Sequence, residues 1–356
     1  DRDAPCVSRA ADVADQAFYC PSGDAVVWDA DGLIPKVERE DGATAVLVVL
    51  AHEIGHAVQT RLGVDELQAR QPARYPTILL EAMADCYAGV ALAHFAQQPP
   101  PGLSVGTDQA VAALIAFRDP LGVSPRDSAA HGNAFDRVSA FQDGYDGSAT
   151  SCSGMTTASH PFTQRAFGSA TDKARHGNLP PDQLLEGVEA SAPAFFTGVA
   201  ASAGATGWQA PSLGPAAAGC AVAAQGPAAW CGRGEPVVVD RPALAALEEK
   251  FGDYAGATLV ADRYGLAVLD ALGRPVTGSA AGAAATCLAG AYTGGLFTAG
   301  DALTLSPGDL DEAVQVLLEQ DWADRDAKGA ADAAEHGYER IDHFRTGVFG
   351  GAKACL

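Results

Sequence analysis

Two short stretches decide the fold: His52-Glu53-Ile54-Gly55-His56 and Glu81-Ala82-Met83-Ala84-Asp85. They lie inside two long apolar segments, residues 43–62 and 77–97, which have the length of buried helices. Residues four apart lie on the same face of a helix, so the ionisable side chains of each stretch point the same way. Burying such groups in apolar helices is costly unless they have a partner. The sequence therefore predicts two buried helices that bring their polar groups together.

The residue types in these stretches suit a zinc site. His52 and His56 can reach one ion from a single helix face, and Glu53 can act beside it as a general base. Zinc needs at least a third protein ligand while it leaves a position open for chemistry, and Glu81 is the best candidate. Asp85 can accept the free N–H of a ligating histidine. The alternative is a buried helix whose two histidines merely pack and hydrogen-bond.

Length, composition and charge limit the possible partners. The 356 residues suggest about two domains, and 48% hydrophobic against 19% charged residues allow a real core. A formal charge of −21 argues against nucleic acid or an anionic membrane as a partner. No run of 18 apolar residues occurs, so we expect no membrane-spanning helix. These limits indicate no particular partner protein.

The cysteines are widely spaced, and none forms a C-x-x-C pair. Their even number predicts four disulfides in a protein that is secreted or held in the cell envelope. The alternative is a cytosolic protein with eight buried free thiols. Because the chain starts at Asp1 without a methionine, we expect that a signal or anchor segment has been removed. The eight are Cys6, Cys20, Cys86, Cys152, Cys220, Cys231, Cys287 and Cys355.

Four sequence blocks recur in the same order in the C-terminal half of the chain, which predicts a tandem repeat. Each copy holds four cysteines in matching places, so the simplest pairing is Cys6–Cys20, Cys86–Cys152, Cys220–Cys231 and Cys287–Cys355. We expect a first domain of residues 1–213, of which 153–213 form an appendage and linker, and a diverged repeat of residues 214–356. The matching blocks are 17–29 with 228–240, 50–58 with 260–268, 84–89 with 285–290, and 137–152 with 340–355.

The second copy lacks the chemical residues of the first. The cysteines and the small Ala-Gly positions are kept, which indicates that the packing survives while the metal chemistry is lost. We therefore expect a non-catalytic copy of the same fold that serves as a structural mate, a lid or a substrate-docking module. The positions of His52, Glu53, His56, Glu81 and Asp85 are taken by Asp262, Arg263, Leu266, Gly282 and Thr286.

The overall pattern predicts an α+β fold that is mostly helical. Residues 18–19 and 25–28 have the pattern of two short strands around the turn Pro21-Ser-Gly-Asp24. Gly63 is a plausible end for the helix over 43–62, and three prolines, residues 99–101, stop the helix over 77–97. Further helices are expected at 108–117, 133–144 and 181–188.

The segment His52–Gln59 followed by Leu80–Gly89 resembles the bacterial neutral zinc metallopeptidases of the gluzincin-like group. The resemblance covers most of residues 15–190, and it implies a zincin-like fold, a zinc cofactor and peptide hydrolysis. Other residues that share it are Phe18-Tyr19-Cys20-Pro21 upstream and His131-Gly132, Arg137, Phe141 and Gly144 downstream.

Carried over position by position, the resemblance makes His52, His56 and Glu81 the zinc ligands and Glu53 the general base. Two other functions stay open at this point. The protein can be an exported binding or scaffold protein with a structural zinc site, or a latent enzyme whose cleft the second copy covers.

The negative oxygen that develops during such a reaction usually needs a second stabilising group. His131 is the first choice because it lies in the resembling block. The second copy keeps a comparable His336-Gly337 near Arg340, which favours a structural role for His131. Arg137, kept as Arg340, is expected to be a structural hydrogen-bond donor. The alternatives to His131 are Tyr87 and Tyr145.

Overall fold

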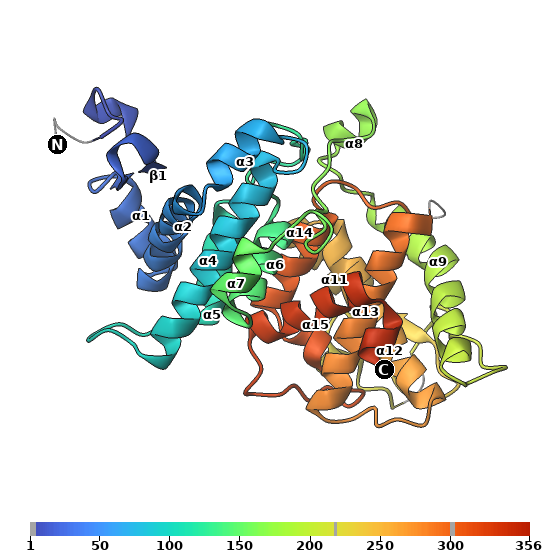
Figure 1. Cartoon of the computed structure of the whole chain (residues 1–356). Coiled ribbons are helices and arrows are strands. Elements are labelled where there is room, and N and C mark those ends of the chain that lie inside the picture. The colour runs from blue at the N-terminus through green and yellow to red at the C-terminus, as the bar shows by residue number, and fades with distance from the viewer. Residues whose placement is uncertain (1–4, 217–218, 300–302) are drawn as a thin grey trace. The chain divides into compact units, whose positions relative to one another are not determined.

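The computed structural model describes residues 5–216, 219–299 and 303–356 of the chain. Contacts divide the chain into two compact units, Asp1–Ala166 and Phe167–Leu356. Each unit combines a two-stranded antiparallel hairpin with a set of packed helices (Figure 1). The predicted α+β class with mostly helical content is therefore confirmed.

The first unit opens with the expected hairpin. β1 (Ala17–Cys20) pairs antiparallel with β2 (Ala25–Trp28), so that Ala17 lies opposite Trp28. Single 3-10 turns, η1 (Ala10–Asp12) and η2 (Pro21–Gly23), lie before and inside it. The helices are α1 (Leu33–Asp41), α2 (Ala43–Arg61), α3 (Val64–Arg70), α4 (Thr77–Gln97), α5 (Thr107–Ala116), α6 (Ala134–Tyr145) and α7 (Ala149–Ser153).

The four helices expected in this unit are present, with ends that differ by one residue at most. Gly63, which follows the C-cap residue Leu62 of α2, has a φ of 74°, a left-handed conformation that glycine adopts without strain. Three helices, α1, α3 and α7, were not expected. α1 is short and mostly polar, and it buries only Leu33 and Val37, so it lacks the long apolar segment from which the other helices were predicted.

α4 is the central helix of the first unit. Every residue from Ile78 to Gly89 is buried, and the helix packs against both α2 and α6. The crossing with α2 is close: a Cβ added to Gly55 would lie 2.9 Å from the Cα of Ala84. No side chain separates the two backbones at this point. The close approach brings His52 and His56 of α2 opposite Glu81 and Asp85 of α4.

The apolar character of α4 qualifies one expectation from the sequence. By length and composition this helix could cross a membrane, although no membrane-spanning helix was expected. However, 72% of the qualifying window is buried inside the protein. α4 is therefore the core helix of its unit.

All eight cysteines are paired, with the connectivity that the repeat suggested. Cys86–Cys152 joins α4 to α7 across a separation of 66 residues, and Cys287–Cys355 makes the matching link in the second unit across 68 residues. The shorter links are Cys6–Cys20 and Cys220–Cys231. Four disulfides are compatible with an oxidising compartment.

The second unit is built around α12 and α13, which pack against each other. Its hairpin consists of β3 (Ala228–Trp230) and β4 (Val237–Val239), with Ala228 opposite Val239. The helices are α8 (Ala170–Ala174), α9 (Pro181–Ser202), α10 (Val222–Gln225), α11 (Arg241–Phe251), α12 (Asp253–Ala271), α13 (Ser279–Ala299), α14 (Asp309–Glu319), the 3-10 turn η3 (Trp322–Asp324), α15 (Gly337–Gly350) and α16 (Ala352–Cys355).

The two units share a succession of elements. A hairpin, a short helix and two long helices are followed by a pair of helices, α5 and α6 in the first unit and α14 and α15 in the second. The close helix crossing recurs as well, because a Cβ on Gly265 would lie 2.9 Å from the Cα of Ala285. These matches support the tandem repeat, which stays a prediction.

α9 corrects two expectations. The helix predicted at 181–188 continues to Ser202, passing through Pro193. Proline removes one helical hydrogen bond, but the segment beyond it buries Phe196 and Ala200. Because α9 packs on α12, the chain from residue 167 onward belongs to the second unit, and the boundary lies at 166/167 instead of 213/214.

Candidate metal centre

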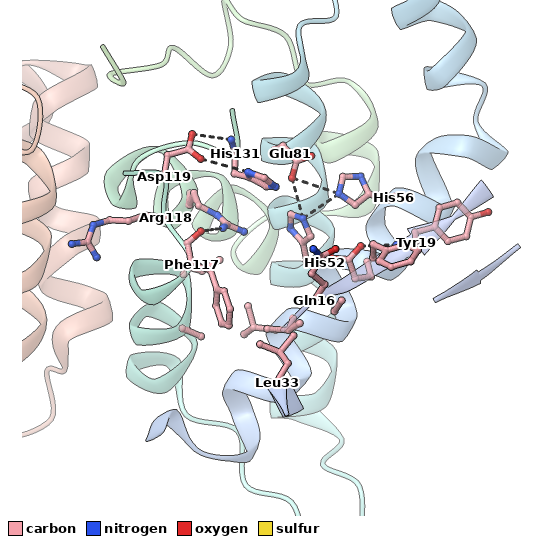
Figure 2. A pocket seen from close by; sticks show the side chains of 18 of the residues that line it. Gln16, Tyr19, Leu33, His52, His56, Glu81, Phe117, Arg118, Asp119 and His131 are labelled. Atoms are coloured by element: carbon pink, nitrogen blue, oxygen red, sulfur yellow. Dashed lines mark hydrogen bonds and ion pairs between the residues drawn. The ribbon is translucent and has the colours of Figure 1, made fainter. Parts of the chain in front are cut away.

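Three donor atoms from α2 and α4 converge in the first unit (Figure 2). Nε2 of His52 lies 3.1 Å from Oε2 of Glu81 and 3.1 Å from Nε2 of His56. Nε2 of His56 lies 3.5 Å from the same oxygen of Glu81. Ligands placed about 2.0–2.1 Å from a tetrahedral zinc would be about 3.3 Å apart. The spacing of the three donors therefore fits zinc.

The electrostatics of this group also favour a cation. Burial alone would lower the pKa of His52, but the carboxylates of Asp85 and Glu81 raise it to about 10. Burial would raise the pKa of Glu81, but the two imidazoles hold it well below its usual value. The group thus attracts positive charge, which either a proton or a metal ion can supply. Three converging donors with the separation of metal ligands favour the metal.

Asp85 accepts a hydrogen bond from His52 on the side of the ring opposite the other donors. Nδ1 of His52 donates to Oδ1 of Asp85 at 2.7 Å, which leaves Nε2 free to face the other donors. Arg137 of α6 donates to both oxygens of Asp85, at 2.8 and 2.9 Å, and to the carbonyl oxygen of Phe117 at 2.5 Å. Burial would raise the pKa of Asp85, but Arg137 and then His52 lower it. Arg137 therefore keeps the carboxylate charged and oriented.

Glu53 lies beside the three donors and is fixed by the hairpin. Its Oε2 accepts the backbone N–H of Tyr19 at 2.9 Å. Burial raises the pKa of Glu53, although the nearby imidazoles of His52 and His56 oppose the shift. Sequence reasoning missed the N–H of Tyr19, because only the packing of β1 against α2 brings it there.

A cavity of about 730 Å³ opens onto these residues. β1, α1, α2 and α5 contribute to its wall, together with the segment that follows α5 (Figure 2). His52, Glu53, His56 and Glu81 all line it, so the donor group faces a space that can admit another molecule. The apolar residues of the wall include Leu33, Val48, Val49, Leu114 and Phe117.

His131 lines the same cavity. Its side chain is 51% exposed, and Nδ1 lies 3.5 Å from Oδ1 of Asp119. Asp119 is buried and also accepts the amide N–H of Gln164 at 2.9 Å. The interaction with Asp119 raises the pKa of His131. Sequence reasoning missed Asp119, which lies 12 residues away in a segment without regular structure.

The structure removes one argument against a chemical role for His131. His336 is the N-cap of α15, just as Asn133 is the N-cap of α6. His336 therefore matches Asn133, and its retention says nothing about His131. The two alternatives are also placed away from the cavity: Tyr87 lies in the core beside Met83, and Tyr145 stacks on Phe141.

At the aligned positions of the second unit, the chain itself fills the space. Arg263 is 1% exposed and bonds to Asp262 and to the carbonyl oxygens of Trp322 and Arg325. Gly282 lets η3 approach, because a Cβ there would lie 2.0 Å from the carbonyl oxygen of Asp324. These contacts replace the donors of the first unit with an arginine and backbone carbonyls.

A second group of carboxylates lies at the start of α12 and α14. Asp253, Asp309 and Glu312 are buried, and each has an oxygen within 4.8 Å of the others. Burial raises the pKa of Asp253 and holds that of Glu312 well above its usual value. Burial and the charge of Asp253 also raise the pKa of Glu248 to about 7. We assign no ligand to these acids.

Comparison with known proteins shows that the region around the centre is similar to one family. Residues 3–155 match the family described as "Putative neutral zinc metallopeptidase". The chain is 34% identical over 146 residues to the uncharacterized protein YpfJ of Escherichia coli K12, an alignment that covers 36% of this chain and 50% of YpfJ. It is 40% identical over 78 residues to the uncharacterized protein Rv2575 of Mycobacterium tuberculosis H37Rv, which covers 20% of this chain and 27% of Rv2575.

The chain thus spans about half the length of YpfJ and less of Rv2575. No solved structure matches it. The matched region contains the whole donor group, including both ligand-bearing helices. The segment of residues 3–155 is therefore similar to the neutral zinc metallopeptidase family.

Proposed function

We propose that this protein is a zinc-dependent peptidase that hydrolyses peptide bonds in a peptide or protein substrate, outside the cytosol. One observation carries the proposal: the donor atoms of His52, His56 and Glu81 converge at the wall of a cavity, with the carboxylate of Glu53 beside them. The family match and the four disulfides support it.

The mechanism follows from the side chains around the cavity. Zinc held by His52, His56 and Glu81 would polarise the scissile carbonyl and make an attacking water more acidic. Glu53 would take the proton of that water and pass it to the leaving amine. The Tyr19 N–H holds one oxygen of Glu53 in place, which limits the motion of the carboxylate between the two transfers. His131 would donate to the oxygen that gains charge.

A scaffold protein with a structural zinc site is the competing function. Structural zinc sites are usually closed by four protein ligands, whereas catalytic sites keep a position open. Over the described ranges 5–216, 219–299 and 303–356, the group at the cavity offers three protein donors. An open position beside a cavity of about 730 Å³ favours the peptidase.

The test is digestion of a mixed peptide library by the purified full chain. We expect cleavage that a zinc chelator abolishes and that added zinc restores. Glu53→Gln should retain zinc, measured by elemental analysis, but lose cleavage by about 10²–10⁴-fold because the proton acceptor is gone. Undiminished cleavage by Glu53→Gln would refute the role of Glu53, and cleavage that survives complete metal removal would refute the proposal.

A further inference from the structure

Gln59 lies one helical turn beyond His56 on α2, and it has no role in the mechanism above. It is 1% exposed, so both ends of its amide need partners inside the protein. Oε1 lies 3.1 Å from Nδ1 of His56, and Nε2 donates to the carbonyl oxygen of Leu80 at 2.5 Å. One amide therefore bridges the second histidine of α2 and the residue that precedes Glu81 on α4.

The bridge can be made in only one way. A carbonyl oxygen only accepts hydrogen bonds, so the amide nitrogen of Gln59 must face Leu80 and its oxygen must face His56. An amide oxygen also only accepts, so Nδ1 of His56 must carry a proton. In the neutral ring the lone pair then lies on Nε2, the atom that faces His52 and Glu81.

We propose that Gln59 is the positioning residue for His56, which fixes the tautomer and the direction of the ring for metal binding. Asp85 has the same relation to His52, so each histidine of the centre has its own acceptor at Nδ1. The inference rests on the proposed function to the extent that the group binds zinc. In the second unit, which lacks the metal donors, Leu269 occupies the position that aligns with Gln59.

The test measures zinc affinity, by competition with a chelator of known affinity, in the full chain. Gln59→Leu keeps the size of the side chain and removes both hydrogen bonds, and we expect zinc binding to weaken by roughly 10–100-fold. Gln59→Glu keeps an acceptor for His56 and loses the donor to Leu80, so its loss of affinity should be smaller. An affinity is the difference between the zinc-bound and zinc-free states, so a general loss of stability does not imitate this result.

Gln225→Leu is the matched control. Gln225 is also a buried glutamine, 2% exposed, and its amide donates to the carbonyl oxygens of Trp230 and Ala327. Gln225 is far in sequence from the three metal donors. We expect this variant to lower the melting temperature and leave zinc affinity unchanged. A second measurement needs no variant: nitrogen chemical shifts of neutral His56 in the zinc-free protein should report a proton on Nδ1.

Three results would overturn the inference. The first is parental zinc affinity in Gln59→Leu, and the second is an equal loss of affinity in Gln59→Leu and Gln59→Glu. The third is a neutral His56 that carries its proton on Nε2. Failure of the proposed function would look different, because a chain that binds zinc and responds to Gln59→Leu, yet cleaves no peptide, would retain the inference and refute the peptidase.

Discussion

Asp85 joins the donor group to the core of its unit, and we predict that Asp85→Asn destabilises the zinc-free protein strongly. The wild-type carboxylate is 0% exposed and accepts from His52 and twice from Arg137. An asparagine has one oxygen and one NH₂ group in its place. Whichever way the amide turns, its NH₂ meets an N–H donor, and the guanidinium of Arg137 loses its counter-charge.

The magnitude follows from the burial of the pair. Breaking a buried ion pair by removing one partner costs about 3–5 kcal/mol of unfolding free energy. For a unit of this size each kcal/mol lowers the melting temperature by roughly 2–4 °C, so the midpoint should fall by roughly 6–20 °C. Differential scanning calorimetry on chelator-treated protein gives this value without a contribution from metal binding.

A double variant separates the ion pair from the simple change of side chain. Arg137→Met alone removes two hydrogen bonds and one positive charge from the buried Asp85 carboxylate, so it should also be destabilising. Asp85→Asn with Arg137→Met should lose less than the two single losses together, because the second change removes the charge that the first leaves unpaired. A loss below about 1 kcal/mol for Asp85→Asn, or strict additivity, would refute this account.

Three further predictions use other parts of the structure. Gly55→Ala should force α2 and α4 apart, which costs about 1–3 kcal/mol of unfolding free energy and weakens zinc binding. Gly265→Ala should destabilise the second unit and leave zinc affinity unchanged. Chemical denaturation measures the stability of each variant, and competition with a chelator measures its zinc affinity. Replacing Cys86–Cys152 by serines should cost about 4 kcal/mol, because the link closes a long loop, measured in the same denaturation assay. Folding raises the pKa of Glu248 to about 7, so the folded protein binds the carboxyl proton more tightly than the unfolded chain does. The melting temperature should therefore fall as pH rises from about 5 to 8. Glu248→Gln should make the melting temperature less dependent on pH.

The local features of the molecule could be predicted because they depend on neighbours in the sequence. The helix over residues 77–97 has the bounds that its apolar length and the prolines after it predict. The hairpin of β1 and β2 forms where the strand pattern and the turn residues place it. The extent of α9 could not be predicted, because Pro193 is a local signal against a helix and only burial against α12 outweighs it.

The sequence by itself determined the chemistry available to the centre: two imidazoles on one face of α2, and two carboxylates on one face of α4. These assignments follow from a fixed helical period. The tertiary structure alone decided which groups hold that chemistry in place. Tyr19 N–H meets Glu53 across 34 residues, Arg137 meets Asp85 across 52, and Gln59 meets Leu80 across 21. No local period connects such partners, because their contacts depend on how whole helices cross.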